Sequence, residues 1–193
     1  MDECNLWRLH GFVRFLNRTM SAAVTNIIML RMLNFLDRGL INGFLGLDLK
    51  QKKAKLYDDG KHDLDLTVLS DVGEAVKAIL ERPFETENRY VHVNTFYTSQ
   101  SKILEILENQ LGRFEVSRVK AQNANKEGSA RIKRGDFGGV KDSLMGVMAS
   151  GLSGVNGEGK DNVMLLGRVT RDTRELEEFM RKIVKGGEGW NFC

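Results

Sequence analysis

The sequence is poor in the residues from which metal sites and disulfide frameworks are built. Its two cysteines, Cys4 and Cys193, lie at the ends of the chain and form no CxxC pair. The three histidines, His10, His62 and His92, share no short metal-ligand spacing. This inventory argues against a disulfide framework and a structural zinc site. We therefore expect no metal, and a reducing, cytoplasmic location.

Long apolar runs and strong charge of one sign are also absent. No apolar run approaches the roughly 20 residues that cross a bilayer, and the acidic start lacks the apolar core of a secretory signal. The 29 basic and 26 acidic residues leave a formal net charge of only +3. Such a small excess does not call for nucleic acid or an anionic membrane, and we expect neither partner. The composition, 41% hydrophobic and 28% charged, is typical of a globular domain.

A glycine-rich turn for binding a dinucleotide is missing. Such a turn follows a strand and opens a helix, so that backbone N–H groups meet the pyrophosphate. The first forty residues contain only Gly11 and Gly39. Further on, Gly43 and Gly46 precede no amphipathic helix pattern. Serine and histidine residues show no triad-like clustering, and Tyr57 and Tyr97 are the candidate proton donors.

Hydrophobic periodicity predicts strands alternating with amphipathic helices. Two short strands, 53–57 and 64–68, are expected around a turn at 58–60. Further strands are expected at 89–94 and 114–119. The stretch 22–33 is apolar, and periodicity does not decide between helix and strand there.

Helix boundaries are indicated by capping residues. Ser70 or Asp71 is expected to cap a helix that ends near Arg82, before the only proline of the chain. Thr98 or Ser99 is expected to cap a second helix, which ends at Gly112. A short helix is predicted through 144–148. Asp172 and Glu175 form a capping-box pattern for a last helix that ends at 186–187.

Several segments, in order and with matching spacing, resemble the middle of fungal NmrA-like proteins, which are atypical short-chain dehydrogenases of the isoflavone-reductase type. The resemblance covers about 34–187 and rests on the segments 34–40 (NFLDRGL), 43–49 (GFLGLDL), 52–60 (KKAKLYDDG), 67–76 (TVLSDVGEAV), 87–94 (ENRYVHVN), 99–104 (SQSKIL) and 133–137 (KRGDF), with the closing helix.

This resemblance implies an α/β fold: a partial Rossmann-like parallel sheet with the smaller, substrate-side α/β subdomain of an NmrA-like protein. It divides the chain into a poorly patterned head (1–33), the matched region (34–187) and a tail (188–193). The family's glycine-rich turn and its catalytic lysine lie upstream of the matched region. The sequence is thus expected to be truncated at its N-terminus, and catalytic and cofactor-binding residues stay unassigned.

The resemblance also implies a function: reduction of a small organic metabolite by NADPH or NADH, in fungi often a step of secondary metabolism. The alternatives are a non-catalytic regulator that binds a partner protein, and an inactive fragment. Phe35, Phe44 and Phe96, near loop positions, are the candidate residues for a substrate pocket. An exposed sheet edge is expected to favour self-association or a protein partner.

Overall fold

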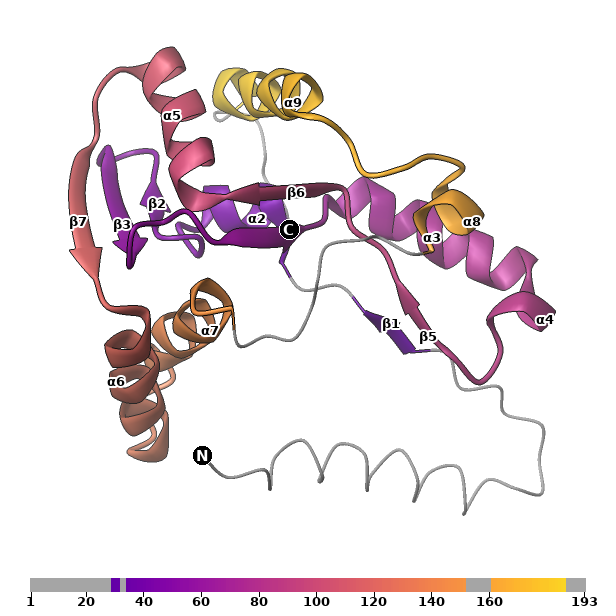
Figure 1. Cartoon of the computed structure of the whole chain (residues 1–193), viewed down its shortest axis with the longest axis horizontal. Coiled ribbons are helices and arrows are strands. Elements are labelled where there is room, and N and C mark those ends of the chain that lie inside the picture. The colour runs from indigo at the N-terminus through magenta and orange to yellow at the C-terminus, as the bar shows by residue number, and fades with distance from the viewer. Residues whose placement is uncertain (1–28, 32–33, 152–160, 187–193) are drawn as a thin grey trace.

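The computed structural model describes residues 29–31, 34–151 and 161–186. The predicted head and tail lie outside this part of the chain, apart from the three residues of β1. The described elements alternate between strands and helices, which confirms the predicted α/β class (Figure 1). They are β1 (Met29–Arg31), α2 (Leu36–Ile41), β2 (Leu47–Asp48), β3 (Lys53–Tyr57), β4 (Asp63–Leu66), α3 (Leu69–Glu81), α4 (Pro83–Thr86), β5 (Tyr90–His92), β6 (Phe96–Ser99), α5 (Gln100–Leu111), β7 (Glu115–Val119), α6 (Ala121–Lys133), α7 (Gly139–Ala149), α8 (Asn162–Leu166) and α9 (Thr173–Gly186).

The described strands form three small sheets. β1 and β5 pair in parallel, β3 lies between antiparallel β2 and parallel β7, and β4 pairs antiparallel with β6. The partial parallel sheet is therefore confirmed. β3 and β4, the two strands expected around the turn at 58–60, do not pair with each other. After β3, the backbone N–H of Asp58 continues the β7 ladder by donating to the carbonyl of Val119, at 2.8 Å.

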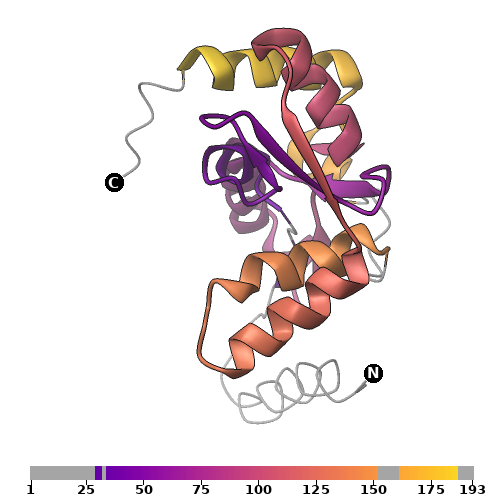
Figure 2. The same cartoon turned by 90° about the vertical axis from the view of Figure 1, so that its left-hand side faces the viewer.

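Two layers of helices enclose the strands of the larger core. α5 and α9 lie on one side, and the antiparallel pair α6–α7 lies on the other (Figures 1 and 2). The side of α9 that faces this core buries Leu176, Met180 and Ile183. A smaller core joins α3 to β5 and α8, through residues such as Ile79 and Val91.

Two of the predicted helix starts are confirmed by their capping hydrogen bonds. At α9, the N–H of Glu175 donates to the Asp172 carboxylate at 2.9 Å, and the N–H of Asp172 donates back to Glu175 at 3.0 Å. At α5, Ser99 Oγ accepts from the N–H of Lys102 at 3.3 Å. Gly112 ends α5 at a φ of 84°, which favours glycine.

The predicted cap of α3 is wrong. The helix begins at Leu69, with Val68 at the N-cap position and no capping side chain of its own. Instead, the carboxylate of Asp37 in α2 accepts the N–H of Leu69 at 3.0 Å. The cap is a tertiary contact, and this leaves the Asp71 side chain for another role.

Three glycines, Gly128, Gly139 and Gly146, let α6 and α7 approach closely. A Cβ on Gly128 would overlap the backbone of Ser143 and Gly139 in α7, and a Cβ on Gly146 would lie 2.6 Å from the backbone nitrogen of Asn125 in α6. Glycine at these helix positions is therefore required by packing rather than by backbone conformation.

Candidate functional site

The carboxyl ends of β1 and β5 mark the candidate site. The two strands run in parallel, with Arg31 beside His92 at their ends. Asn34 and Phe35 follow β1, while Asn94 and Thr95 follow β5. Ligands of open α/β sheets bind at the carboxyl ends of parallel strands, which points to this edge of the fold.

A hollow of about 220 Å³ opens beside this edge. We call it the aromatic hollow, and it is lined by Asn34, Phe35, Arg38, Gly39, Asn42 and Phe44. It brings together two of the three predicted pocket residues, Phe35 and Phe44. Phe96 lies elsewhere: it is 1% exposed, and its ring packs against Phe179 at a centroid distance of 5.8 Å. The assignment of these three residues to a substrate pocket stays a prediction.

Buried amides hold the backbone behind the aromatic hollow. Asn34 Nδ2 donates to the backbone carbonyl of Asp65 at 3.4 Å, and Asn94 Nδ2 donates to the Asp65 carboxylate at 2.7 Å. Asn162, from α8, donates to the Asn94 carbonyl at 2.7 Å and accepts the Asn94 N–H at 3.1 Å. These bonds fix the segments that follow β1 and β5 relative to β4.

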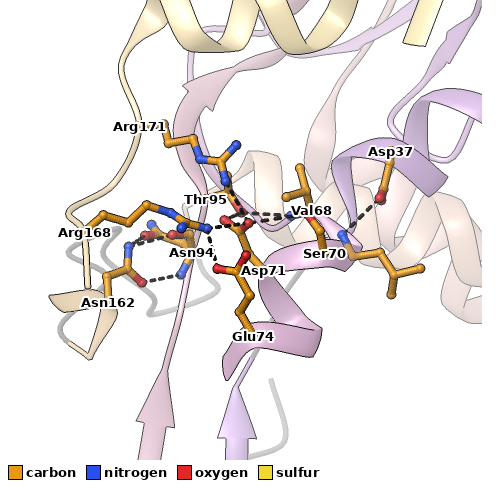
Figure 3. A network of polar contacts seen from close by, with 11 residues as sticks. Asp37, Val68, Ser70, Asp71, Glu74, Asn94, Thr95, Asn162, Arg168 and Arg171 are labelled. Carbon is orange, nitrogen blue, oxygen red and sulfur yellow. Dashed lines mark hydrogen bonds and ion pairs between the residues drawn. The ribbon is translucent and has the colours of Figure 1, made fainter. Parts of the chain in front are cut away.

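The Asp71 side chain forms a second polar group next to this edge (Figure 3). Asp71 is 1% exposed, and its Oδ1 accepts from Arg168 at 2.7 Å and from Arg171 at 2.8 Å. Its Oδ2 accepts from the hydroxyl of Thr95 at 2.8 Å. A buried carboxylate needs such partners to offset its desolvation. We call these four residues the Asp71 clamp, because they tie α3 to the segment after β5 and to the segment before α9.

A larger cavity of about 620 Å³ lies at the other end of α2. We call it the lysine cavity. Its walls come from the end of α2, the β2–β3 hairpin, α7 and the ends of α5 and α9. Figure 2 shows the hairpin lying between α9 and α7. The sequence alone does not reveal this site, because the charged residues of its lining are dispersed over 94 positions of the chain (48–141). These residues are Asp48, Lys50, Lys53, Lys55 and Lys141.

A hydrogen-bonded group lies at the α7 side of this cavity. Asp142 Oδ1 accepts from Lys55 Nζ at 2.7 Å and from the Tyr57 hydroxyl at 3.0 Å. Burial would raise the pKa of Asp142, but the hydrogen bond and charge of Lys55, with Tyr57 and Lys141, outweigh it and lower the pKa. Burial, followed by the charge of Asp142 and its hydrogen bond, raises the pKa of Tyr57. Tyr57 is therefore a poor proton donor near neutral pH.

Tyr57 and Lys61 have the Tyr-x-x-x-Lys spacing of ordinary short-chain dehydrogenases. The spacing places two side chains on one face only within a helix. Here Tyr57 ends a strand, and Lys61 follows a turn and is exposed. The structure does not bring the two side chains together as a catalytic pair.

The raised pKa of Tyr57 predicts a loss of stability at alkaline pH. The unfolded tyrosine releases its proton near pH 10, whereas the folded one holds it, so the folded state binds more protons above pH 10. The stabilisation is complete below that pH and is lost as the pH rises further. We expect the free energy of unfolding to fall less between pH 9 and pH 11 in Tyr57→Phe than in the wild type. Urea unfolding at both pH values measures this, and equal falls would contradict it.

Within the described segments, no group of three or more histidine, cysteine, aspartate or glutamate side chains is arranged to hold a metal ion. The helices of those segments also include none that is long and apolar enough to span a bilayer.

Two fungal proteins are similar to this chain in sequence. No family model matches the chain. Oxidoreductase poxI of Penicillium oxalicum is 31% identical over 105 residues, which cover 54% of this chain and 33% of poxI. Oxidoreductase aprR of Aspergillus flavus is 26% identical over 148 residues, which cover 76% of this chain and 49% of aprR. The matches thus span about a third to a half of the length of these relatives.

Solved structures share the fold over most of the chain. A triphenylmethane reductase from Citrobacter sp., solved with NADP(H), gives a TM-score of 0.61 at 14% identity, covering 91% of this chain and 58% of that one. An isoflavone reductase gives 0.59 at 16% identity, covering 92% and 59%. The fold is isoflavone-reductase-like. A nucleoside-diphosphate-sugar epimerase from Staphylococcus aureus gives 0.58 at 16% identity, covering 85% and 56%.

The resemblance predicted from the sequence is therefore confirmed.

Proposed function

We propose that the chain forms the substrate-facing side of an NAD(P)H-dependent oxidoreductase that reduces a small organic metabolite. The observation that carries the proposal is the sequence similarity to the fungal oxidoreductases poxI and aprR. The fold supports it, because ligands of such sheets bind at the carboxyl ends of the parallel strands, where the aromatic hollow lies.

The described residues fit only part of a nicotinamide dinucleotide. The aromatic hollow offers phenylalanine rings and amide groups of the kind that line pockets for small aromatic molecules. The pyrophosphate needs a glycine-rich turn at a helix N-terminus after a strand, and no such turn occurs among the described residues. We therefore assign no catalytic step to the nucleotide. Phe35 and Phe44 then contact the substrate, and Phe96 stays in the core, packed against Phe179.

The test measures nucleotide binding and turnover separately. Calorimetry on the purified, monodisperse chain is expected to show binding of NADPH or NADH that is weaker than micromolar, because the glycine-rich turn for the pyrophosphate does not occur among the described residues. The ratio of the two affinities decides between the two nucleotides. Turnover is followed as loss of NADPH absorbance with a panel of aromatic carbonyl compounds. Phe35→Ala is expected to raise KM at least tenfold and to change nucleotide affinity less than twofold, because burying an aromatic ring contributes over 1.4 kcal/mol.

Phe84→Ala is the matched control. Phe84 is 88% exposed on α4, so its loss is expected to leave KM unchanged. Binding of neither nucleotide to the folded chain would contradict the proposal. That outcome would favour the non-catalytic regulator, whose partner protein or self-association through a sheet edge is then sought by sedimentation.

A further inference from the structure

The lysine cavity combines two kinds of wall. One is apolar and comes from α2, α5 and α9, with Ile41, Leu111 and Ile183 among its side chains. The other is cationic and comes from the β2–β3 hairpin and from Lys141 at the start of α7. At about 620 Å³, the cavity falls within the size range of small-molecule sites.

Most charges around the cavity already have partners. Lys55 is bonded to Asp142 at 2.7 Å, and Lys53 lies 4.0 Å from Glu115. The Asp48 carboxylate accepts the backbone N–H groups of Lys50 and Gln51, at 3.0 and 2.9 Å. These contacts hold the hairpin in shape and engage the acidic groups near the cavity.

Lys141 differs from these lysines. It forms no hydrogen bond or ion pair with any residue of the described segments, although its side chain is partly buried. Its ammonium nitrogen points toward Gly43, and lies 3.8 Å from where a Cβ on that glycine would be. Burial lowers the pKa of Lys141, and the charge of Lys55 adds to this against Asp142 and Asp48. A cation that has lost water without gaining a partner is stabilised by an incoming anion.

We propose that the lysine cavity binds a small organic acid, whose carboxylate pairs with Lys141 and whose apolar body lies against Ile41, Leu111 and Ile183. A bare anion would leave the apolar wall uncovered, and a neutral apolar molecule would leave the lysine without a partner. Only a molecule with both parts satisfies both walls. The two hollows share a single lining residue, Asn42, so this inference does not rest on the proposed reductase activity.

Calorimetry with three probes at pH 7 tests the proposal on the full chain. Octanoate carries both parts, octanamide lacks the charge, and inorganic phosphate lacks the apolar body. Octanoate is expected to bind at least tenfold more tightly than either of the others, because a charge-assisted hydrogen bond is worth a factor of this order. Equal affinity for octanamide, equal affinity for phosphate, or no binding of octanoate would overturn the proposal.

Substitution of the lysine locates the site. Lys141→Met keeps the length of the side chain and removes its charge, and it is expected to weaken octanoate binding at least tenfold. The control, Lys126→Met, removes the same charge from an exposed position on α6 that does not line the cavity. It is expected to change the affinity less than twofold. An unchanged affinity in Lys141→Met, or an equal loss in both variants, would place the acid elsewhere.

A measurement on the wild-type chain covers the case in which Lys141→Met does not fold. Trinitrobenzenesulfonate modifies unprotonated lysines, and peptide mass spectrometry reports the rate at each one. Octanoate is expected to slow modification of Lys141 at least fivefold and to leave Lys126 unaffected. Equal rates at Lys141 with and without octanoate would overturn the proposal.

Discussion

Replacing Asp71 by alanine is expected to lower the free energy of unfolding by about 3 kcal/mol. The substitution leaves two guanidinium groups and the Thr95 hydroxyl without their shared acceptor. Loss of one member of a buried ion pair costs about 3 to 5 kcal/mol, and we expect the lower end because both arginines keep contact with solvent. Urea denaturation followed by circular dichroism measures the difference.

Glu74→Gln is the control for this prediction. Glu74 bonds to the same arginine, Arg168, at 3.0 Å, but its side chain is 54% exposed. An exposed ion pair contributes about 1 kcal/mol or less, so the control is expected to be nearly neutral. Equal losses in the two variants would show that the Asp71 clamp contributes no more than a surface ion pair.

Glycine-to-alanine substitutions in α6 and α3 are expected to change the free energy of unfolding in opposite directions. Gly128→Ala in α6 places a Cβ against the backbone of α7, so the two helices must move apart. Overpacking of this kind lowers the free energy of unfolding by about 2 to 3 kcal/mol. The measurement is again urea denaturation, with the melting temperature as a second observable.

Gly73→Ala in α3 makes the same chemical change where nothing lies within 4 Å of the added Cβ. Alanine is a better helix former than glycine, so this variant is expected to gain about 0.5 to 1 kcal/mol. A loss in Gly73→Ala, or a gain in Gly128→Ala, would contradict the packing of the α6–α7 pair described above.

Local patterns in the sequence predicted the elements whose signals are contained within one segment. The capping box of Asp172 and Glu175 needs only residues three apart, and the cap of α5 by Ser99 is equally local. Both are present. β6, a short strand directly before α5, was not predicted, because two of its four residues, Thr98 and Ser99, were considered as the cap of the helix. The helix α6 was also not predicted. Its buried residues, such as Ala121 and Ala124, are small, so the segment has no strong apolar stripe.

Features that depend on distant residues were not predictable from these patterns. Aspartate commonly caps helices, and Asp71 stands near the start of α3. The hydrogen bond to the first turn of α3 comes instead from Asp37, which lies in another helix. The alternation of 53–57 and 64–68 is the same whether the strands pair together or with β7 and β6. The lysine cavity has no local signal at all, because Lys141 meets the hairpin only after the chain has folded. Phe35 and Phe44 were candidates because they lie near loop positions in the segments that resemble the family, and their role in a substrate pocket stays a prediction.

The span of the Asp71 clamp along the chain has a consequence for the order of folding. Its two arginine bonds join residues 97 and 100 positions apart, whereas the α6–α7 pair forms within about 30 consecutive residues. Closing a long loop costs more chain entropy than closing a short one, and contacts between distant residues slow folding. We therefore infer that the helical pair assembles early and the clamp closes late. A contact that is made after the rate-limiting step acts mainly on the unfolding rate. The clamp then determines how long the folded chain persists, rather than how quickly it forms.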